Sequence, residues 1–190
     1  MGIAEITGFI VLGFAMGAQL WLRSFLLTHR RKVIAIGASL IVVAIAILCW
    51  RQYQLWSIDP VGKFLLPPYR SMGYFWYYVG SRFALPWITS AACGFLVYWA
   101  AKILNKKFGE HFFEEEEPFF FGLAVFGCGY PALLIYVIIM ALGSLFLSLL
   151  YFLLKKGRAP LYYLWFPMGI FAILVAYYVL PHEAFVKLKL

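Results

Sequence analysis

Two groups of carboxylates are the residues of this sequence best suited to chemistry. Asp59 is the only aspartate, and residues 114–117 are four consecutive glutamates. Two carboxylates a few Å apart cannot both ionise, so a pair can share a proton and activate water against a peptide bond. The alternative is structural: Asp59 ends a helix, and the glutamates lie in water near a helix start after Pro118, where negative charge is favourable.

A metal site is a weaker possibility. His111 precedes Glu114 by three residues and Glu115 by four, so the three side chains would share one face of a helix. A ferritin-like site needs further Glu and Glu-x-x-His sets on other helices, and the sequence has no second set. The three cysteines lie far apart within apolar runs, which indicates buried apolar side chains: Cys49, Cys93 and Cys128. We therefore expect no metal and no cofactor.

The elements that must position the carboxylates are membrane helices. Residues 119–154 contain no charged side chain over 36 positions. A straight helix of that length would measure roughly 54 Å, whereas a bilayer core is about 30 Å thick. The run must therefore break, and Gly127, Gly129 and Pro131 mark the place. This pattern predicts a hairpin of two helices that begins directly after the acidic block.

The composition is that of an integral membrane protein. Hydrophobic residues make up 65% of the 190 residues and charged residues only 13%, whereas soluble domains are about half apolar and about a quarter charged. The net charge of +8 is carried by short basic clusters between apolar runs, which is typical of loops at an anionic membrane face. We therefore expect contact with the lipid bilayer, no nucleic-acid partner, and one domain over residues 1–190.

Five apolar runs are clear, and they predict an all-α, polytopic transmembrane bundle. The long run counts as two spans, and the aromatic segment Tyr74–Tyr78 is either an interfacial belt or a further short span, which makes six or seven passes. Gly13 and Gly17 form a small-xxx-small pattern that lets two membrane helices approach closely. The runs are Ile6–Leu27, Val33–Trp50, Ala84–Ala101, 119–154 and Leu161–Leu180.

The basic clusters predict which segments share a side of the membrane. Residues 30–32, 102–107 and 155–158 all favour the cytoplasmic side. Spans between consecutive clusters then come in pairs, so residues 51–82, including Asp59, lie outside. If Tyr74–Tyr78 also crosses the membrane, one basic cluster is on the opposite side from the others.

The order of these motifs resembles that of type IV prepilin peptidases. Ile58-Asp59 followed by Leu65-Leu66-Pro67 is similar to the first catalytic segment of that family. Glu117-Pro118-Phe119 leading to Gly129-Tyr130-Pro131 resembles the family's GxGD segment and the break that follows it. In this alignment Glu117 replaces the second catalytic aspartate, and Glu114 and Glu116 replace the motif glycines. Those glycines let the backbone turn tightly to place the acid.

The resemblance implies a membrane aspartic endopeptidase that cleaves the leader peptide of a pilin-like precursor, in a bacterial or archaeal cytoplasmic membrane. Asp59 and Glu117 would be its catalytic pair, one as base for water and one as acid. The replaced motif residues leave an inactive relative as an equal alternative. A competing class is a non-catalytic polytopic subunit of a larger membrane complex, which packs through the Gly13/Gly17 face.

Overall fold

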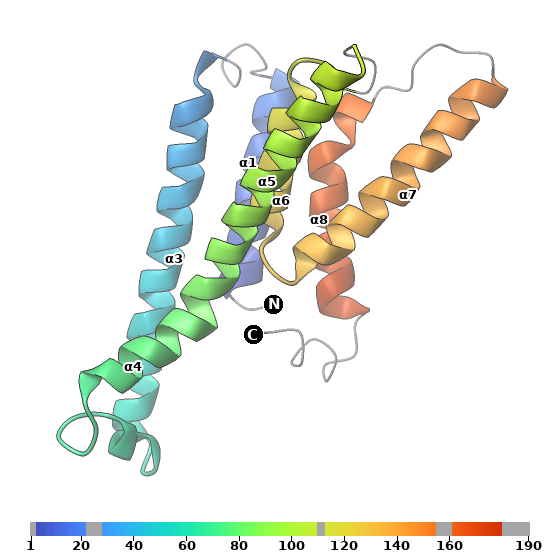
Figure 1. Cartoon of the computed structure of the whole chain (residues 1–190). Helices are drawn as coiled ribbons and strands as arrows, with labels where there is room; N and C mark the ends of the chain where they lie inside the picture. The colour runs from blue at the N-terminus through green and yellow to red at the C-terminus, as the bar shows by residue number, and fades with distance from the viewer. Residues whose placement is uncertain (1–2, 22–27, 110–112, 155–160, 180–190) are drawn as a thin grey trace.

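The computed structural model describes residues 3–21, 28–109, 113–154 and 161–179, and these residues form an all-helical bundle (Figure 1). The predicted all-α class is confirmed, and no strand occurs in the described ranges. The α-helices are α1 (Ile3–Trp21), α3 (Arg30–Ile58), α4 (Met72–Val79), α5 (Leu85–Lys107), α6 (Glu117–Cys128), α7 (Ala132–Leu153) and α8 (Trp165–Tyr178).

Within the described ranges, three helical segments are long and apolar enough to cross a membrane. They are Arg30–Ile58, Met72–Lys107 and Ala132–Leu153. Three shorter apolar helices accompany them, within Ile6–Trp21, Glu117–Cys128 and Trp165–Tyr178. The predicted membrane location is therefore compatible with the fold, whereas the number of passes stays a prediction.

Helix α6 lies at the centre of the bundle, in contact with α1, α5, α7 and α8. Ten of its twelve residues are buried. The side chain of Phe120 is fully buried and meets the Phe166 ring of α8 edge-on at 5.7 Å between ring centroids. Because α6 is so short and so enclosed, its apolar composition reflects contact with protein more than contact with lipid.

The predicted break in the long apolar run is confirmed. Helix α6 ends at Cys128, and α7 begins at Ala132 and runs back along the bundle (Figure 1). Gly129 has φ 68° and ψ 157°, a backbone region that is open almost only to glycine. The ring of Trp87 covers this glycine, so the irregular backbone is enclosed by protein, as it must be within a bilayer.

The aromatic segment Tyr74–Tyr78 is not a separate span. It belongs to α4, which continues through a π-helical turn at Gly80–Ala84 (η2) into α5. Pro86 lies at the start of α5 and has no N–H to donate, and a π turn accommodates such a missing bond without ending the helix. Tyr74–Tyr78 and Ala84–Ala101, which the sequence allowed to be two separate spans, are thus parts of one helical segment.

The closest helix approach also differs from the expected one. No other part of the described chain lies within 4 Å of a Cβ placed on Gly13, and Gly17 meets only its own helix's Trp21. Instead, a Cβ on Gly94 of α5 would lie 2.6 Å from the Gly122 carbonyl oxygen of α6. Close glycine contacts therefore join α5 to α6 at Gly94 and α1 to α6 at Gly8, where a Cβ would lie 2.8 Å from the Gly127 carbonyl oxygen. Among the described residues, nothing packs against the Gly13 face of α1.

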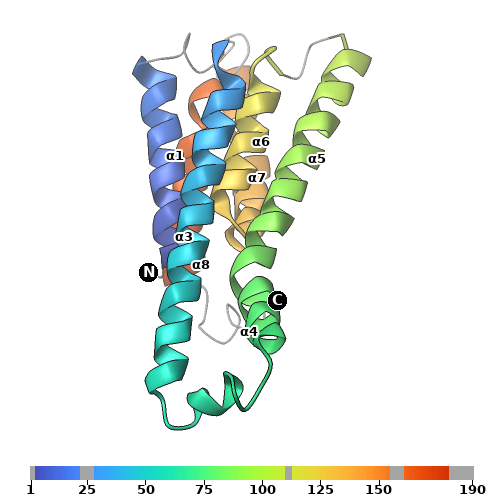
Figure 2. The same cartoon turned by 90° about the vertical axis from the view of Figure 1, so that its left-hand side faces the viewer.

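Helices α3 and α5 form the two arms of a V (Figure 2). They are joined where α3 ends, because Trp56 contacts the rings of Tyr74, Phe75 and Tyr78 in α4. Towards the other end of the bundle the arms separate, and α6 lies between them (Figure 2). Residues of α3, α5 and α6 line a groove at this end, with α6 as its floor.

Candidate functional site

Asp59 lies in the turn after α3, where it is exposed and stabilises the local backbone. The Gly62 N–H donates a hydrogen bond to Asp59 Oδ2 at 2.6 Å, and the Lys63 N–H donates to the Asp59 carbonyl oxygen at 3.1 Å. A Cβ on Gly62 would lie 2.9 Å from Asp59 Oδ2 and 3.1 Å from the Trp56 backbone. The Asp59 carboxylate and Gly62, which has no side chain to clash with it, together form a tight turn at the end of α3.

Glu117 is the first residue of α6 and is 3% exposed. The Glu114 N–H donates to Glu117 Oε2 at 2.9 Å, and the Glu117 N–H donates to the Glu114 carbonyl oxygen at 3.1 Å. This closed turn places negative charge at a helix N-terminus, where it is favourable. The helix-start part of the structural alternative therefore describes this geometry. Glu114 and Glu115 are exposed as that alternative expects, whereas Glu117 is buried and does not lie in water.

The segment before this turn is fixed to α5 by a buried asparagine. Asn105 Nδ2 donates to the Phe113 carbonyl oxygen, and the Phe113 N–H donates to Asn105 Oδ1, both at 2.9 Å. The two bonds fasten the connector to the last turns of α5. They hold the start of α6 beside the basic end of α5, where Lys106 and Lys107 lie.

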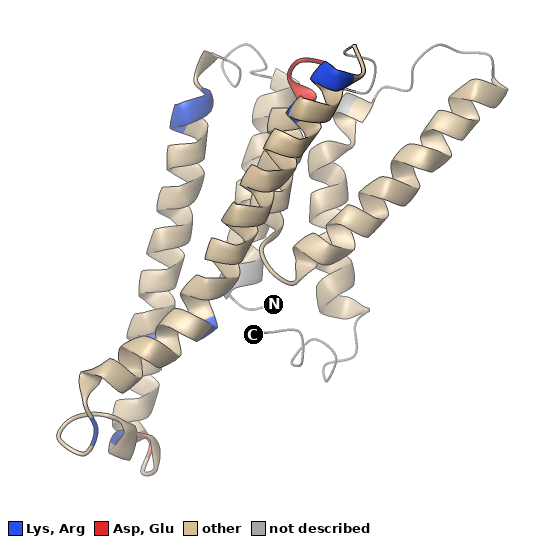
Figure 3. Cartoon of the chain, viewed as in Figure 1, with Lys and Arg blue, Asp and Glu red and all other residues tan. Residues whose placement is uncertain are grey.

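The structure does not bring Asp59 and Glu117 together. The Arg30 guanidinium carbon lies 5.6 Å from the ring centroid of Phe119, so α3 begins at the Glu117 end of the bundle. Asp59 follows the other end of α3, 29 residues later, which corresponds to about 43 Å along a helix. Figure 3 shows the glutamates and Asp59 at opposite ends of the bundle. The predicted acid pair is separated because a single helical segment, α4 continued by α5, lies between Asp59 and Glu117, where two segments would have returned the chain to the same end.

The same view confirms that two of the basic clusters share an end. Arg30–Lys32 and Lys106–Lys107 lie beside the glutamate turn (Figure 3). Residues 155–158 and His111 fall outside the described ranges. Among the residues that the structure does describe, no group of three His, Cys, Asp or Glu side chains is placed to hold a metal ion.

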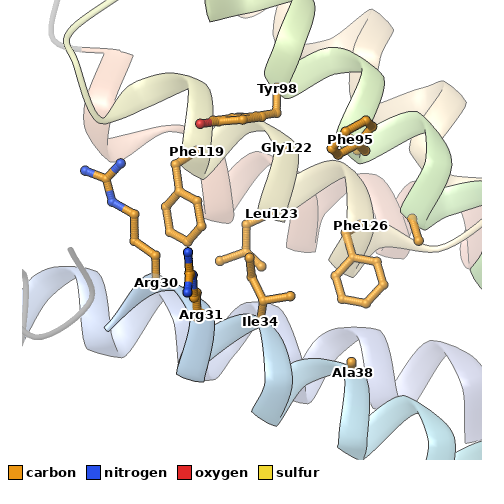
Figure 4. Close-up of a pocket in the computed structure, with 12 residues that line it drawn as sticks. Arg30, Arg31, Ile34, Ala38, Phe95, Tyr98, Phe119, Gly122, Leu123 and Phe126 are labelled. Atoms are coloured by element: carbon orange, nitrogen blue, oxygen red, sulfur yellow. The ribbon is translucent and has the colours of Figure 1, made fainter. Parts of the chain in front are cut away.

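A pocket of about 510 Å³ occupies the groove between α3, α5 and α6 (Figure 4). Its apolar walls come from all three helices, and Arg30 and Arg31 lie at one end while Ala38 and Phe126 lie at the other (Figure 4). No acidic side chain lines it. Pockets of this volume are typical of small-molecule and lipid sites.

The arginines of this pocket are held in distinct ways. Arg30 is partly buried, with its guanidinium over the Phe119 ring, and its Nε is buried without a hydrogen-bond partner among the described residues. Arg31 is exposed beside it. An unpaired guanidinium N–H in an apolar groove is costly unless an acceptor reaches it. The pocket is therefore incomplete at its charged end.

Close helix packing shapes the floor of the pocket. Gly94 and Gly122 let α5 and α6 touch backbone to backbone, and the Ser90 hydroxyl donates to the Val125 carbonyl oxygen at 2.8 Å. These contacts fix α5 against α6, whereas α3 is separated from α5 at this end of the bundle (Figure 2).

The sequence interpretation missed this site because it treated residues 30–32 as a loop. A signal was present in the sequence: Arg30, Ile34 and Ala38 are spaced by four residues and share one helix face. It becomes visible only if the helix begins at Arg30, as it does here, and not after the basic cluster.

Comparisons of this chain with protein-family models, with curated proteins and with solved structures found no match.

Proposed function

We propose that this chain is a non-catalytic integral membrane protein that serves as a small subunit of a membrane complex, with a motif order similar to that of type IV prepilin peptidases. The observation that carries the proposal is that α3 begins beside α6 at Arg30 and ends at Asp59, about 43 Å further along the helix, so that Asp59 and Glu117 lie at opposite ends of α3. Aspartic peptidase chemistry needs two carboxylates within a few Å, so that they share one proton.

The local contacts of the two acids support the same proposal. Asp59 accepts the Gly62 N–H in a helix-ending turn, and Glu117 accepts the Glu114 N–H at a helix start. Each carboxylate thus performs a structural task that needs no partner acid. Local hydrogen bonds of this kind are worth about 1 kcal/mol each, which is reason enough for an acid at either position.

The free face of α1 supports the role of a subunit. Gly13 has no neighbour within 4 Å outside its own helix, and the exposed residues Ile6, Ile10 and Phe14 lie on the same side of α1. Small residues flanked by large apolar ones allow the close approach that membrane helices use to associate. This is the face through which a partner helix would pack.

Leader-peptide cleavage tests the non-catalytic part of the proposal. A pilin-like precursor is co-expressed with the wild-type chain, with Asp59→Asn and with Glu117→Gln, and its processing is followed by electrophoresis. We expect no processing in any of the three. Processing by the wild type that both substitutions abolish would show that the two acids form a catalytic pair and would refute the proposal.

Association in mild detergent tests the subunit part. We expect the wild-type chain to co-purify with a defined partner, and the pair Gly13→Leu and Gly17→Leu to release that partner because the added side chains fill the α1 face. The matched control carries Ala35→Leu and Ser39→Leu on the exposed side of α3 and should retain the partner. A wild-type chain that is a stable monomer in the same detergent would contradict the proposed role.

A further inference from the structure

The groove between α3, α5 and α6 has the depth of one membrane leaflet. Arg30 and Ala38 line it from end to end and are eight residues apart on one helix, which corresponds to about 12 Å. Half of a bilayer core measures about 15 Å. The charged end lies at the end of the bundle where α3 begins, and the apolar walls run from there towards the middle of the bundle (Figure 4).

The charged end is suited to an anion. Arg30 and Arg31 lie in the first turn of α3, a turn that contains no acidic residue. The positive end of the helix dipole therefore adds to two guanidinium groups. The Arg30 Nε is buried without a hydrogen-bond partner among the described residues, so no described acceptor engages the guanidinium through this atom. The guanidinium groups of Arg30 and Arg31 suit a phosphate, which arginine binds through charge-assisted hydrogen bonds.

We propose that this groove binds one anionic phospholipid from the leaflet at the Arg30 end. Its phosphate accepts hydrogen bonds from Arg30 and Arg31, and one acyl chain lies against Ile34, Phe95 and Phe126. The apolar walls match the acyl chain of such a lipid, and the arginine pair matches its phosphate, which the planar guanidinium group binds well. This inference stands whether or not the chain assembles with a partner subunit.

The chemistry of the pocket favours a phospholipid over a helix from another protein. Its walls are apolar, no acidic side chain lines it, and its two arginines lie at one end. A phospholipid supplies both an apolar chain for the walls and a phosphate for the arginines. A membrane helix would have to carry an acidic side chain at that position to match the charged end.

Lipid retention by the full-length chain tests the charged end. The protein is exchanged into detergent containing either phosphatidylglycerol or phosphatidylcholine, and bound lipid is counted by native mass spectrometry. We expect selective retention of phosphatidylglycerol. The pair Arg30→Gln and Arg31→Gln should weaken it at least about tenfold, since a hydrogen bond between a charged side chain and a phosphate contributes about that factor or more.

Matched controls separate the site from the general charge of that membrane face. The pair Lys106→Gln and Lys107→Gln removes two charges at the same end but outside the pocket, and it should change retention less than twofold. The pair Arg30→Lys and Arg31→Lys keeps the charge and should lose only part of the retention. Equal retention of both lipids by the wild type, or unchanged retention in the glutamine pair, would overturn the proposal.

A second measurement tests the apolar end and the identity of the occupant. Ala38→Trp fills the groove and should abolish retention, whereas Ala35→Trp, on α3 but outside the pocket, should not. A photoreactive side chain at Ala91 should crosslink to phospholipid in the native membrane. A crosslink to a polypeptide, or displacement of the lipid by inorganic phosphate alone, would show a different occupant and refute the assignment.

Discussion

An added methyl group at the crossing of α5 and α6 should destabilise the fold, and the expected size follows from the contacts. A Cβ on Gly94 would lie 2.6 Å from the Gly122 carbonyl oxygen and 3.3 Å from the Phe126 backbone nitrogen. Both atoms belong to the backbone of α6, which is enclosed by four helices and cannot move at low cost. Gly94→Ala therefore forces α5 away from α6.

Two effects of opposite sign determine the magnitude. Overpacking of a well-packed site costs about 1–3 kcal/mol. Replacement of glycine by alanine within a helix stabilises by about 0.5–1 kcal/mol. Gly13→Ala in α1 is the matched control, because it has the helix gain and meets no neighbour within 4 Å. The difference between the two variants cancels the helix term and should equal the overpacking cost of about 1–3 kcal/mol.

The assay is reversible unfolding of the full-length protein in mixed detergent micelles of increasing dodecyl sulfate content, followed by circular dichroism. Gly94→Ala should unfold at lower dodecyl sulfate than Gly13→Ala. Equal midpoints for the two variants would mean that α5 and α6 do not touch at Gly94, and the floor of the groove would have to be redrawn.

Three further predictions concern the contacts around this crossing. Gly129→Ala should destabilise the protein by about 1–3 kcal/mol, measured by the same unfolding assay, because alanine is strained at φ 68° and ψ 157° and its methyl group meets Trp87. Ser90→Ala should cost only about 0.6 kcal/mol, the typical value of a hydrogen bond between membrane helices, and a loss above 2 kcal/mol would assign Ser90 a larger role. Asn105→Ala removes both bonds to Phe113 and should increase proteolysis of the connector after α5, whereas Lys106→Ala should leave proteolysis unchanged.

The break between α6 and α7 could be predicted from the sequence because its cause is local. An uncharged run of 36 residues is too long for one helix, and a glycine followed by a proline offers the place to end it. The shared end of two basic clusters was predictable for a related reason, since charged side chains stay at membrane faces. In both cases the chemistry of adjacent residues decides the outcome.

The basic clusters place Asp59 on the opposite side from residues 102–107, whereas the family resemblance requires Asp59 and Glu117 on one side. The sequence could not decide between the two, because the relation depends on the number of helical segments between the acids. An odd number places the two acids at opposite ends and an even number places them at one end. That number rests on residues 80–84, where a π turn continues the helix past Pro86 instead of ending it. Hydropathy does not distinguish a belt, a short span and an extension of the next helix.

The helix ends were also misjudged where charge interrupts an apolar run. Helix α3 begins at Arg30 and ends at Ile58, although the apolar stretch covers only Val33–Trp50. The first turn can contain arginines because their long side chains reach the membrane face, and the last turns are covered by the aromatic rings of α4. The lipid groove escaped notice for the same reason, since its charged end lies in that first turn.

The distance between the two acidic turns is the most direct test of the central claim. Spin labels at Val61 and Glu115, both exposed, are introduced after the three native cysteines are replaced, and their separation is measured by double electron–electron resonance. We expect a single distribution near the 43 Å length of α3. A distribution centred below about 20 Å, which is shorter than the bilayer core of about 30 Å, would place Asp59 and Glu117 at the same membrane face and restore the catalytic pair.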